Sequence, residues 1–422
     1  MTVRPILHFT ARDGWINDPH GITPSEGGYD VFFQFVPAST VWQPTCRWGH
    51  ATGPTLFELT ELPIALAPGD GDDGIWTGSL LPASSGDRLG GRIYYTSIVQ
   101  PGIGIGRVRE AVPTDANWIG WQKRDIVVDG PPIGMGISAF RDPFLYRDSE
   151  TVMALVGAAL PNGRAAALRY EVPAEGQWIY RGVLASRSVR ETEPTWMGSL
   201  WECPQMIPLS GGGHALITSV WEDDVLHYAA CGLGEYRNGE FIASDWLRLT
   251  WGDSHYAPSA FQDEVGRWCV LFWMRGIGGD GDGWAGAHSV PYLVDSHDGL
   301  RLVVHPDIAG YRRPASIDGP LGPHVDVLWT HGVDGSVSLI VGATTIEVGA
   351  DHGEVTIRVD ERRIAKLPSD GSVRLLIDGG VVEVVVGGRI CGAAIAGGAV
   401  QIQGSGSIEV WELERSWPVE EV

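Results

Sequence analysis

A chain of 422 residues is too long for one ordinary hydrophobic core and predicts about two domains of unequal size. Its formal net charge of −22, from 30 basic and 52 acidic residues, would repel phosphate backbones and anionic lipid surfaces. The charge therefore argues against nucleic acid and membranes as partners and favours a small neutral substrate.

The beginning of the chain, MTVRPILHFTARDG, lacks the apolar stretch of a secretory leader, and no later segment approaches the ~20 apolar residues that span a bilayer. We therefore predict a soluble, cytoplasmic protein. The cysteines form no C-x-x-C pair and have no histidine nearby at zinc-ligand spacing, so we predict neither a metal site nor a disulfide framework. Small buried side chains are expected at Cys46, Cys203, Cys231, Cys269 and Cys391.

Turn-forming residues recur along the whole chain, with 58 glycines and 27 prolines between short apolar segments, and this rhythm predicts an all-β fold. Long amphipathic helical patterns are absent from the sequence. In chain order, the clearest strand candidates of the first part are YDVFFQFV (29–36), GRIYYTSIV (91–99), TVMALVGAAL (151–160) and RWCVLFWMRG (267–276).

The composition changes near residue 300, where dense tryptophan gives way to alternating apolar and polar residues. The segments SVSLIVG, EVTIRV, SVRLLIDGGVVEVVVGG and SIEVWEL have the pattern of two packed antiparallel sheets, so we predict a β-sandwich over 320–422. A linker is expected over 301–319. Residues 1–300 must close many short strands without exposed edges, and a barrel, a propeller or a second sandwich could each do so.

Three carboxylates share an unusual local pattern. Asp18 lies in WINDPHG, Asp142 in FRDPFLY and Glu202 in LWECPQM, each within two residues of a proline and beside apolar neighbours. Acids are costly to bury in such surroundings unless they are paired or used. If the first part is a propeller, equivalent positions on different blades bring the three acids to its central channel.

Convergent carboxylates near tryptophans favour glycoside chemistry. One acid must give a proton to the leaving oxygen, and another must be ionised to attack or stabilise an oxocarbenium-like centre. Glu202 has an apolar neighbour on each side, Trp201 and Cys203, and this environment favours Glu202 as the proton donor. The flat apolar faces available to sugar rings are those of Trp15, Trp42, Trp48, Trp76 and Trp201.

The motifs WINDPHG, FFQF, WGHAT, LPIALAP, WTGS, FRDP and WECP, in this order, resemble glycoside hydrolase family 32, the invertase, inulinase and levanase group. The resemblance covers nearly the whole chain, because the C-terminal RLLIDGGVVEVVVGG is also similar to a sandwich strand of that family. It implies a five-bladed β-propeller over 1–300, followed by the β-sandwich.

The resemblance also implies an activity, the hydrolysis of terminal β-fructofuranosides with retention of configuration and without a cofactor. By their motifs, Asp18 would be the nucleophile, Glu202 the acid that becomes the base, and Asp142 the residue that holds two adjacent fructose hydroxyls. The residues implied to line the fructose pocket are Asn17, Gln34, Trp42, Trp48, Ser79 and Arg141, with Trp76 near the rim.

The sequence departs from the family pattern at three places. After WGHAT, the family usually shows Asp-Leu and then a Trp, where this chain has Thr55, Leu56 and Leu59. His20 replaces the usual asparagine of the first motif, and we favour a structural role for it over proton transfer. The fifth-blade motif reads TWGDSHYA, in which Gly252, Tyr256 and Ala257 match well. A separate segment, GIGGDG (276–281), has the letters of a dinucleotide fingerprint, but no helical pattern follows it, so no nucleotide cofactor is predicted.

Two alternatives stay open at this stage. The same site could transfer the fructosyl group to a sugar instead of water, which makes a fructosyltransferase. A non-catalytic fructan-binding protein on the same scaffold is less favoured, because binding alone needs no proton donor.

Overall fold

The computed structural model describes residues 2–25, 27–83, 87–297 and 299–415. This part of the chain is all-β: besides strands it contains two short 3₁₀ helices, η1 (Arg88–Gly90) and η2 (Pro306–Tyr311), and no α-helix. The predicted all-β class is confirmed. Among the described residues, no helix is both long and apolar enough to cross a membrane.

Three antiparallel sheets of four strands each follow one another along the chain, and in each the strands pair in sequence order. The first contains β5 (Gly74–Leu81), β6 (Arg92–Ile98), β7 (Arg107–Pro113) and β8 (Trp121–Val128). The second contains β9 (Ala139–Asp148), β10 (Thr151–Leu160), β11 (Arg164–Glu171) and β12 (Ile179–Ser188). The third contains β13 (Leu200–Pro208), β14 (His214–Glu222), β15 (Val225–Arg237) and β16 (Glu240–Arg248).

A nine-stranded sheet connects the beginning of the chain to the residues before 305. Its strands are β1 (Gly14–Ser25), β2 (Gly28–Val36), β3 (Arg47–Gly53), β4 (Thr60–Leu66), β18 (His255–Gln262), β19 (Trp268–Gly279), β20 (Trp284–His288), β21 (Tyr292–Asp295) and β22 (Arg301–Val304). β20 pairs in parallel with β1, with Gly14 opposite Trp284. This pairing joins two groups of strands that are distant in sequence.

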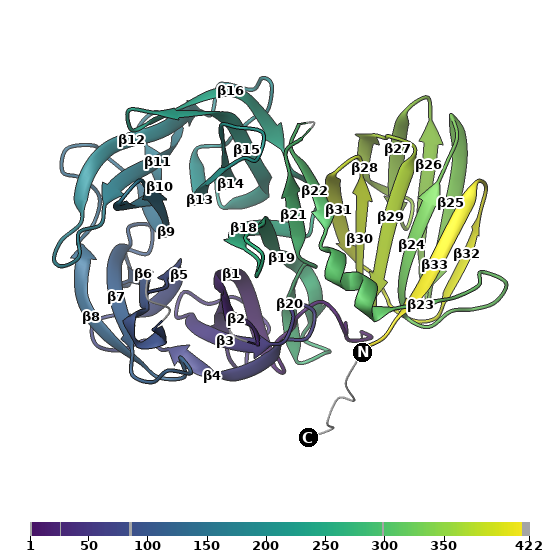
Figure 1. The fold of residues 1–422 in the computed structure, drawn as a ribbon, viewed down its shortest axis with the longest axis horizontal. Coiled ribbons are helices and arrows are strands. Elements are labelled where there is room, and N and C mark those ends of the chain that lie inside the picture. Colours follow the sequence, from purple (N-terminus) through teal and green to yellow (C-terminus); the bar gives the residue numbers. More distant parts are fainter. Residues whose placement is uncertain (1, 26, 84–86, 298, 416–422) are drawn as a thin grey trace.

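Figure 1 shows these sheets arranged around a common centre, with β1, β5, β9, β13 and β18 nearest to it. The strands are held in place by apolar residues on both faces; β2, for example, is buried along its whole length. Because the innermost strands converge, side chains that are far apart in the sequence meet at the centre.

The C-terminal residues form two sheets that pack face to face. One contains β17 (Thr250–Gly252), β23 (Arg312–Pro314), β24 (His324–Thr330), β29 (Ser372–Asp378), β30 (Val381–Val386), β31 (Arg389–Ala394) and β33 (Ser407–Leu413). The other contains β25 (Asp334–Val341), β26 (Thr344–Asp351), β27 (Glu354–Val359), β28 (Arg362–Pro368) and β32 (Val400–Gly404). Alternation of buried and exposed residues, as in β26, directs one face of each sheet into a shared core around Trp329.

The N-terminal and C-terminal parts share an apolar core. Phe272 and Tyr292 from the first part cluster with Leu376 and Ile390 from the second. The short strand β17, which precedes β18 in the chain, pairs with β31 of the C-terminal sheet. All five cysteines are buried, as predicted, and each is free.

Candidate active site

Each innermost strand is interrupted by a bulge at the centre of the molecule. In β1, the ladder shifts register between Ile16 and Pro19, at Asn17 and Asp18. Comparable shifts fall at Thr77 in β5, Asp142 and Pro143 in β9, Cys203 and Pro204 in β13, and Ala257 and Pro258 in β18. A bulge re-aims side chains, and proline is tolerated there because no ladder N–H is required. The prolines beside the three acids therefore mark where each strand leaves its ladder.

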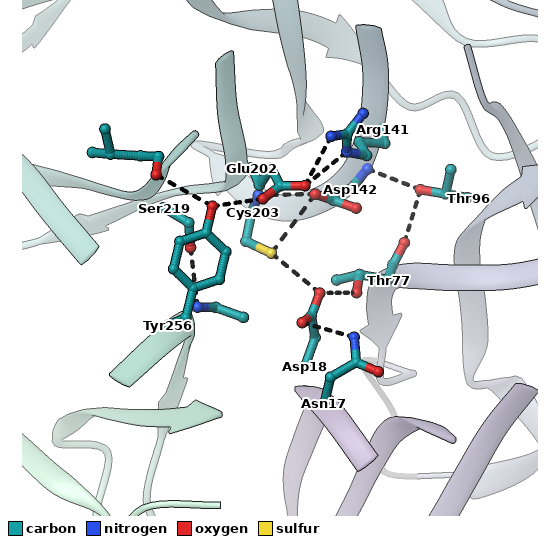
Figure 2. A network of polar contacts seen from close by, with 12 residues as sticks. Asn17, Asp18, Thr77, Thr96, Arg141, Asp142, Glu202, Cys203, Ser219 and Tyr256 are labelled. Carbon is teal, nitrogen blue, oxygen red and sulfur yellow. Dashed lines mark hydrogen bonds and ion pairs between the residues drawn. The ribbon is translucent and has the colours of Figure 1, made fainter. Parts of the chain in front are cut away.

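The three acids singled out in the sequence lie around one space. Figure 2 shows Asp18, Asp142 and Glu202, which come from β1, β9 and β13, directed toward one another. The thiol of Cys203 connects two of them, because its Sγ lies 3.8 Å from Asp18 Oδ2 and 3.7 Å from Asp142 Oδ2. Residues far apart in the chain thus form a single carboxylate cluster.

Asp18 is held by side-chain donors on both of its oxygens. Asn17 Nδ2 donates to Oδ1 at 3.1 Å, while Gln34 Nε2 at 3.0 Å and Thr77 Oγ1 at 2.6 Å donate to Oδ2. Burial raises the pKa of Asp18 and the charge of Glu202 adds to this, whereas the bonds from Thr77 and Asn17 lower it. These donors fix the carboxylate's orientation and favour its ionised form.

Asp142 has a backbone conformation that few residues adopt. Its φ is +64°, in the left-handed region that aspartate and asparagine enter more readily than other non-glycine residues. Its amide donates to Thr96 Oγ1 at 2.8 Å, and its Oδ2 accepts from the Cys203 amide at 3.1 Å. Burial, followed by the charge of Glu202, raises the pKa of Asp142.

Glu202 is bound by a cation and by a phenol. Arg141 lies at Oε1, with Nε at 3.0 Å and Nη2 at 2.9 Å, and Tyr256 OH donates to Oε2 at 2.6 Å. Burial, and then the charge of Glu202, raises the pKa of the Tyr256 phenol well above its usual value, so this hydroxyl stays a donor. The sequence indicated only apolar neighbours for Glu202, and the structure adds these two polar contacts.

The residues implied to line the pocket occupy two kinds of position. Gln34 and Asn17 contact Asp18 directly, and the Arg141 guanidinium lies 5.9 Å from the centroid of the Trp76 ring. The Trp42 ring, 38% exposed, meets Trp76 edge to face at 5.6 Å. Arg141, Trp76 and Trp42 thus form a wall that begins at Glu202.

Two other residues implied for the pocket lie behind this wall. Trp48 has 0% exposure and its indole donates to Trp76 O at 2.9 Å. Ser79 Oγ donates to Pro143 O at 2.7 Å, which ties β5 to the bulge of β9. Their geometry is that of supports for the residues in front of them.

His20 packs against Trp48, with ring centroids 4.0 Å apart, and neither ring nitrogen has a hydrogen-bond partner among the described residues. Burial lowers the pKa of His20 well below its usual value, so the ring is neutral. It lines a cavity of about 440 Å³ together with Asp142 and Cys203. Neither Asp18 nor Glu202 belongs to its lining, so the cavity reaches the carboxylate cluster at Asp142 and Cys203.

Four residues near the acids were missed from the sequence as site residues: Thr77, Thr96, Cys203 and Tyr256. Thr77 lies within WTGS and Cys203 within WECP, so both motifs contained the signal. Tyr256 directly precedes the Ala257–Pro258 bulge, and the same proline pattern that marks the three acids could have identified it.

A second cluster has side chains suited to a metal ion. The ligand atoms of Asp263, Cys269 and His305, all buried, lie within 4.8 Å of one another. However, Arg267 Nε already donates to Asp263 Oδ2 at 2.6 Å, and Arg267 Nη2 lies 3.3 Å from His305 Nε2. A fixed cation between these ligands opposes a second one. The other group of this kind, Asp334, Asp351 and His352, is exposed.

Three carboxylates lie around one space in this all-β protein, beside an arginine and two tryptophans. These are the side chains that a glycoside hydrolase requires. The profile of the Glycosyl hydrolases family 32 N-terminal domain matches residues 8–306. The chain belongs to glycosyl hydrolase family 32, which confirms the resemblance seen in its motifs.

Known relatives are similar to this chain over most of its length. A sucrose-6-phosphate hydrolase from Escherichia coli is 29% identical over 71% of this chain and 64% of its own, and a raffinose invertase from Escherichia coli is 29% identical over 82% and 74%. A fructan 6-exohydrolase from Beta vulgaris is 26% identical over 72% and 54%. The chain therefore spans less than two thirds of the length of some of these relatives.

Solved structures share the fold at lower sequence identity. A Bombyx mori family 32 β-fructofuranosidase has a TM-score of 0.84 at 21% identity and covers 99% of this chain and 95% of its own. Fructan 1-exohydrolase IIa from Cichorium intybus has a TM-score of 0.78 at 18% identity, with 97% of each chain covered.

Proposed function

We propose that this protein is a retaining β-fructofuranosidase that hydrolyses terminal, non-reducing β-D-fructofuranosides such as sucrose, fructo-oligosaccharides or fructans. The observation that carries the proposal is the convergence of Asp18, Asp142 and Glu202 on one space. The names of its family relatives, a sucrose-6-phosphate hydrolase, an invertase and a fructan exohydrolase, support the same chemistry.

In this mechanism Asp18 attacks the anomeric carbon of the fructosyl ring while Glu202 protonates the leaving glycosidic oxygen. The carbon–oxygen bond to the leaving group breaks as the bond to Asp18 forms. Glu202 then removes a proton from water, which attacks the same carbon and releases fructose and Asp18. The three donors on Asp18 support this role, because they aim one carboxylate without a metal.

Asp142 is assigned to two adjacent fructose hydroxyls, whose bonds strengthen in the transition state. Thr96 accepts a bond from its backbone amide and the Cys203 amide donates to its carboxylate, and these two contacts support such a positioning role. Asn17, Gln34, Arg141 and Trp42 are assigned to the fructose pocket, with Trp76 near its rim and Trp48 and Ser79 behind the pocket wall.

The proposed architecture is a five-bladed propeller over 1–300, a connection over 301–319 and a β-sandwich over 320–422. In this description the group β18, β19, β21 and β22 is the fifth blade, and the pairing of β20 with β1 closes the ring. The last strand of that blade, β22, lies within residues 301–319, and the rest of the connection contains η2 and β23. The cytoplasmic location stays a prediction from the sequence.

Release of fructose from sucrose, inulin and levan tests the function. The Asp18→Asn variant is expected to lose turnover on all three, because an amide cannot form the fructosyl-enzyme. Proton NMR of the first-formed fructose should show the β anomer. Inverted product, or undiminished activity of the variant, would refute the mechanism. Formation of trisaccharide in place of free fructose at high sucrose would indicate a fructosyltransferase. Binding of fructan without release of any product would indicate a non-catalytic binding protein.

A further inference from the structure

The C-terminal sheet holds the chain immediately before Tyr256. β17 adds to the edge of that sheet, with Thr250 opposite Ile390 and Gly252 opposite Gly392. β18 begins three residues after Gly252 and enters the centre of the N-terminal part. The strand that presents Tyr256 to Glu202 is therefore anchored outside the N-terminal sheets.

A second contact lies next to Tyr256 itself. His255 Nε2 lies 2.6 Å from Glu383 Oε2 of β30, and both side chains have 0% exposure. Glu383 is a multiple acceptor: Tyr292 OH donates at 2.5 Å, the Val290 amide at 2.8 Å, and His8 Nε2 lies at 2.7 Å. Burial acts to raise the pKa of Glu383, but the bonds and charges of His255 and His8 outweigh it and hold the pKa below its usual range.

The ring of His255 packs closely against Gly392 of β31. A Cβ built on Gly392 would lie 2.6 Å from His255 Cε1 and 2.9 Å from Met274 Cε. The glycine of β31 thus lets the ring reach Glu383. The C-terminal sheet provides both the acceptor for His255 and the gap that the ring fills.

His255 and Tyr256 are consecutive on a strand, so their side chains point to opposite faces. One reaches Glu383, and the other donates to Glu202 Oε2 at 2.6 Å. Arg275 steadies the second, because its guanidinium lies 4.9 Å from the Tyr256 ring centroid and its amide donates to Ser254 O at 2.9 Å. Displacement of His255 would therefore shift Tyr256 and change its hydrogen bond to Glu202.

We propose that Glu383, through His255 and Tyr256, positions Glu202 for proton transfer, so that the C-terminal sheet sets the geometry of the proton donor. Glu383, His255 and Tyr256 are positioning residues, since none of them is assigned a contact with substrate. The charged and titratable groups around Glu202 are Arg141 and Asp142 from β9, Asp18 from β1, Cys203 from β13, Tyr256 from β18 and Arg275 from β19. This inference rests on the proposed function, in which Glu202 is the acid.

The test compares a poor and a good leaving group. Sucrose requires protonation of its leaving oxygen, whereas p-nitrophenyl β-D-fructofuranoside releases a stable phenolate with little help. A general acid contributes about 10²–10⁴-fold, so misplacing it in Glu383→Gln or Tyr256→Phe should lower kcat/KM for sucrose at least about tenfold. The same variants should lose less than about threefold on the aryl fructoside, with the KM for sucrose nearly unchanged.

The matched control is Asp326→Asn, because Asp326 is also a buried carboxylate of the C-terminal sheet but bonds to Arg312 and Arg374, neither of which bonds to Glu383. It should leave the ratio of the two kcat/KM values within about twofold of wild type. If Glu383→Gln does not fold, the Gly392→Ala variant tests the inference in its place. This substitution displaces His255 without changing a charge, so it should lower kcat/KM for sucrose but not for the aryl fructoside. Equal losses on both substrates, or none on either, would overturn the inference. If the wild-type protein released no fructose from either substrate, the proposed function itself would be refuted.

Discussion

His8 Nδ1 and Asp378 Oδ2 lie 2.7 Å apart, although one residue is near the start of the chain and the other is in the C-terminal sheet. The same ring bonds to Glu383 Oε1 through Nε2, also at 2.7 Å, and the amides of Ile6, Leu7 and His8 donate to Asp378. Two buried carboxylates thus clamp the N-terminal segment. A histidine between two acids is a cation with both of its N–H groups bound.

This clamp predicts that stability falls at high pH. Burial alone would lower the pKa of His8, but the bonds that its ring donates to Asp378 and Glu383 raise it to about 9. Since the folded pKa exceeds the unfolded value, the stabilisation is complete below about pH 6.5 and is lost as pH rises through about 9. By this linkage it amounts to about 3 kcal/mol. Chemical unfolding at pH 7 and pH 10 should show the loss, and His8→Gln should remove the difference between them.

The two acids predict the opposite trend at low pH. The bonds and charges of His8 and of their other histidine partners hold the pKa of Asp378 and of Glu383 below its usual range, outweighing burial. Their stabilisation is therefore present above about pH 4 and is lost as pH falls through their folded values. In Asp378→Asn the unfolding midpoint should depend less on pH in this acid range than in wild type. An unchanged acid slope would contradict the assignment.

Asp142→Asn should fold normally and lose activity. Asparagine tolerates the left-handed φ of +64°, so the melting temperature should stay close to that of wild type. Loss of one group that stabilises the transition state typically costs about 10²–10³-fold in rate, and this range is expected for sucrose hydrolysis. Initial rates and circular dichroism melts check both parts. Asp142→Ala is the comparison, because alanine fits this backbone poorly and should also lower the melting temperature.

Chelation should leave the reaction rate unchanged. The oxygens of Asp18 accept bonds from Asn17, Gln34 and Thr77, and those of Glu202 are bound by Arg141 and Tyr256. A cation at the cluster would have to displace these donors. Fructose release from sucrose before and after dialysis against EDTA, with metal content measured, should agree. A loss that added zinc or calcium restores would show that a metal takes part.

Much of the strand pattern follows from local sequence. TVMALVGAAL (151–160) coincides with β10 because an apolar run between turn residues has few alternatives, and YDVFFQFV (29–36) differs from β2 by one residue. β17 has three residues and β20 has five, and both pair with distant strands in parallel. Such short segments contain no periodic signal, so the joining of distant parts could not be predicted from them.

The candidate site also has features that local sequence predicts and features that it does not. Asp18, Asp142 and Glu202 were visible because a proline beside a carboxylate in apolar sequence is unusual, and the bulges explain that pattern physically. The contact between Tyr256 and Glu202, and the clamp of His8 by Asp378, depend on how separate sheets approach one another. No local preference encodes such an approach.

Two tryptophans implied for the same pocket should behave differently when they are replaced. Trp42 is 38% exposed and contacts Trp76 at the rim, so Trp42→Ala should raise the KM for sucrose several-fold with little change in kcat, and should alter stability by less than about 0.5 kcal/mol. Trp48 has 0% exposure and supports both His20 and Trp76. Trp48→Ala should therefore lower the free energy of unfolding by about 3–5 kcal/mol. Steady-state kinetics and denaturant unfolding of both variants separate the two roles, and a stable Trp48→Ala protein with only an altered KM would place that ring in the pocket.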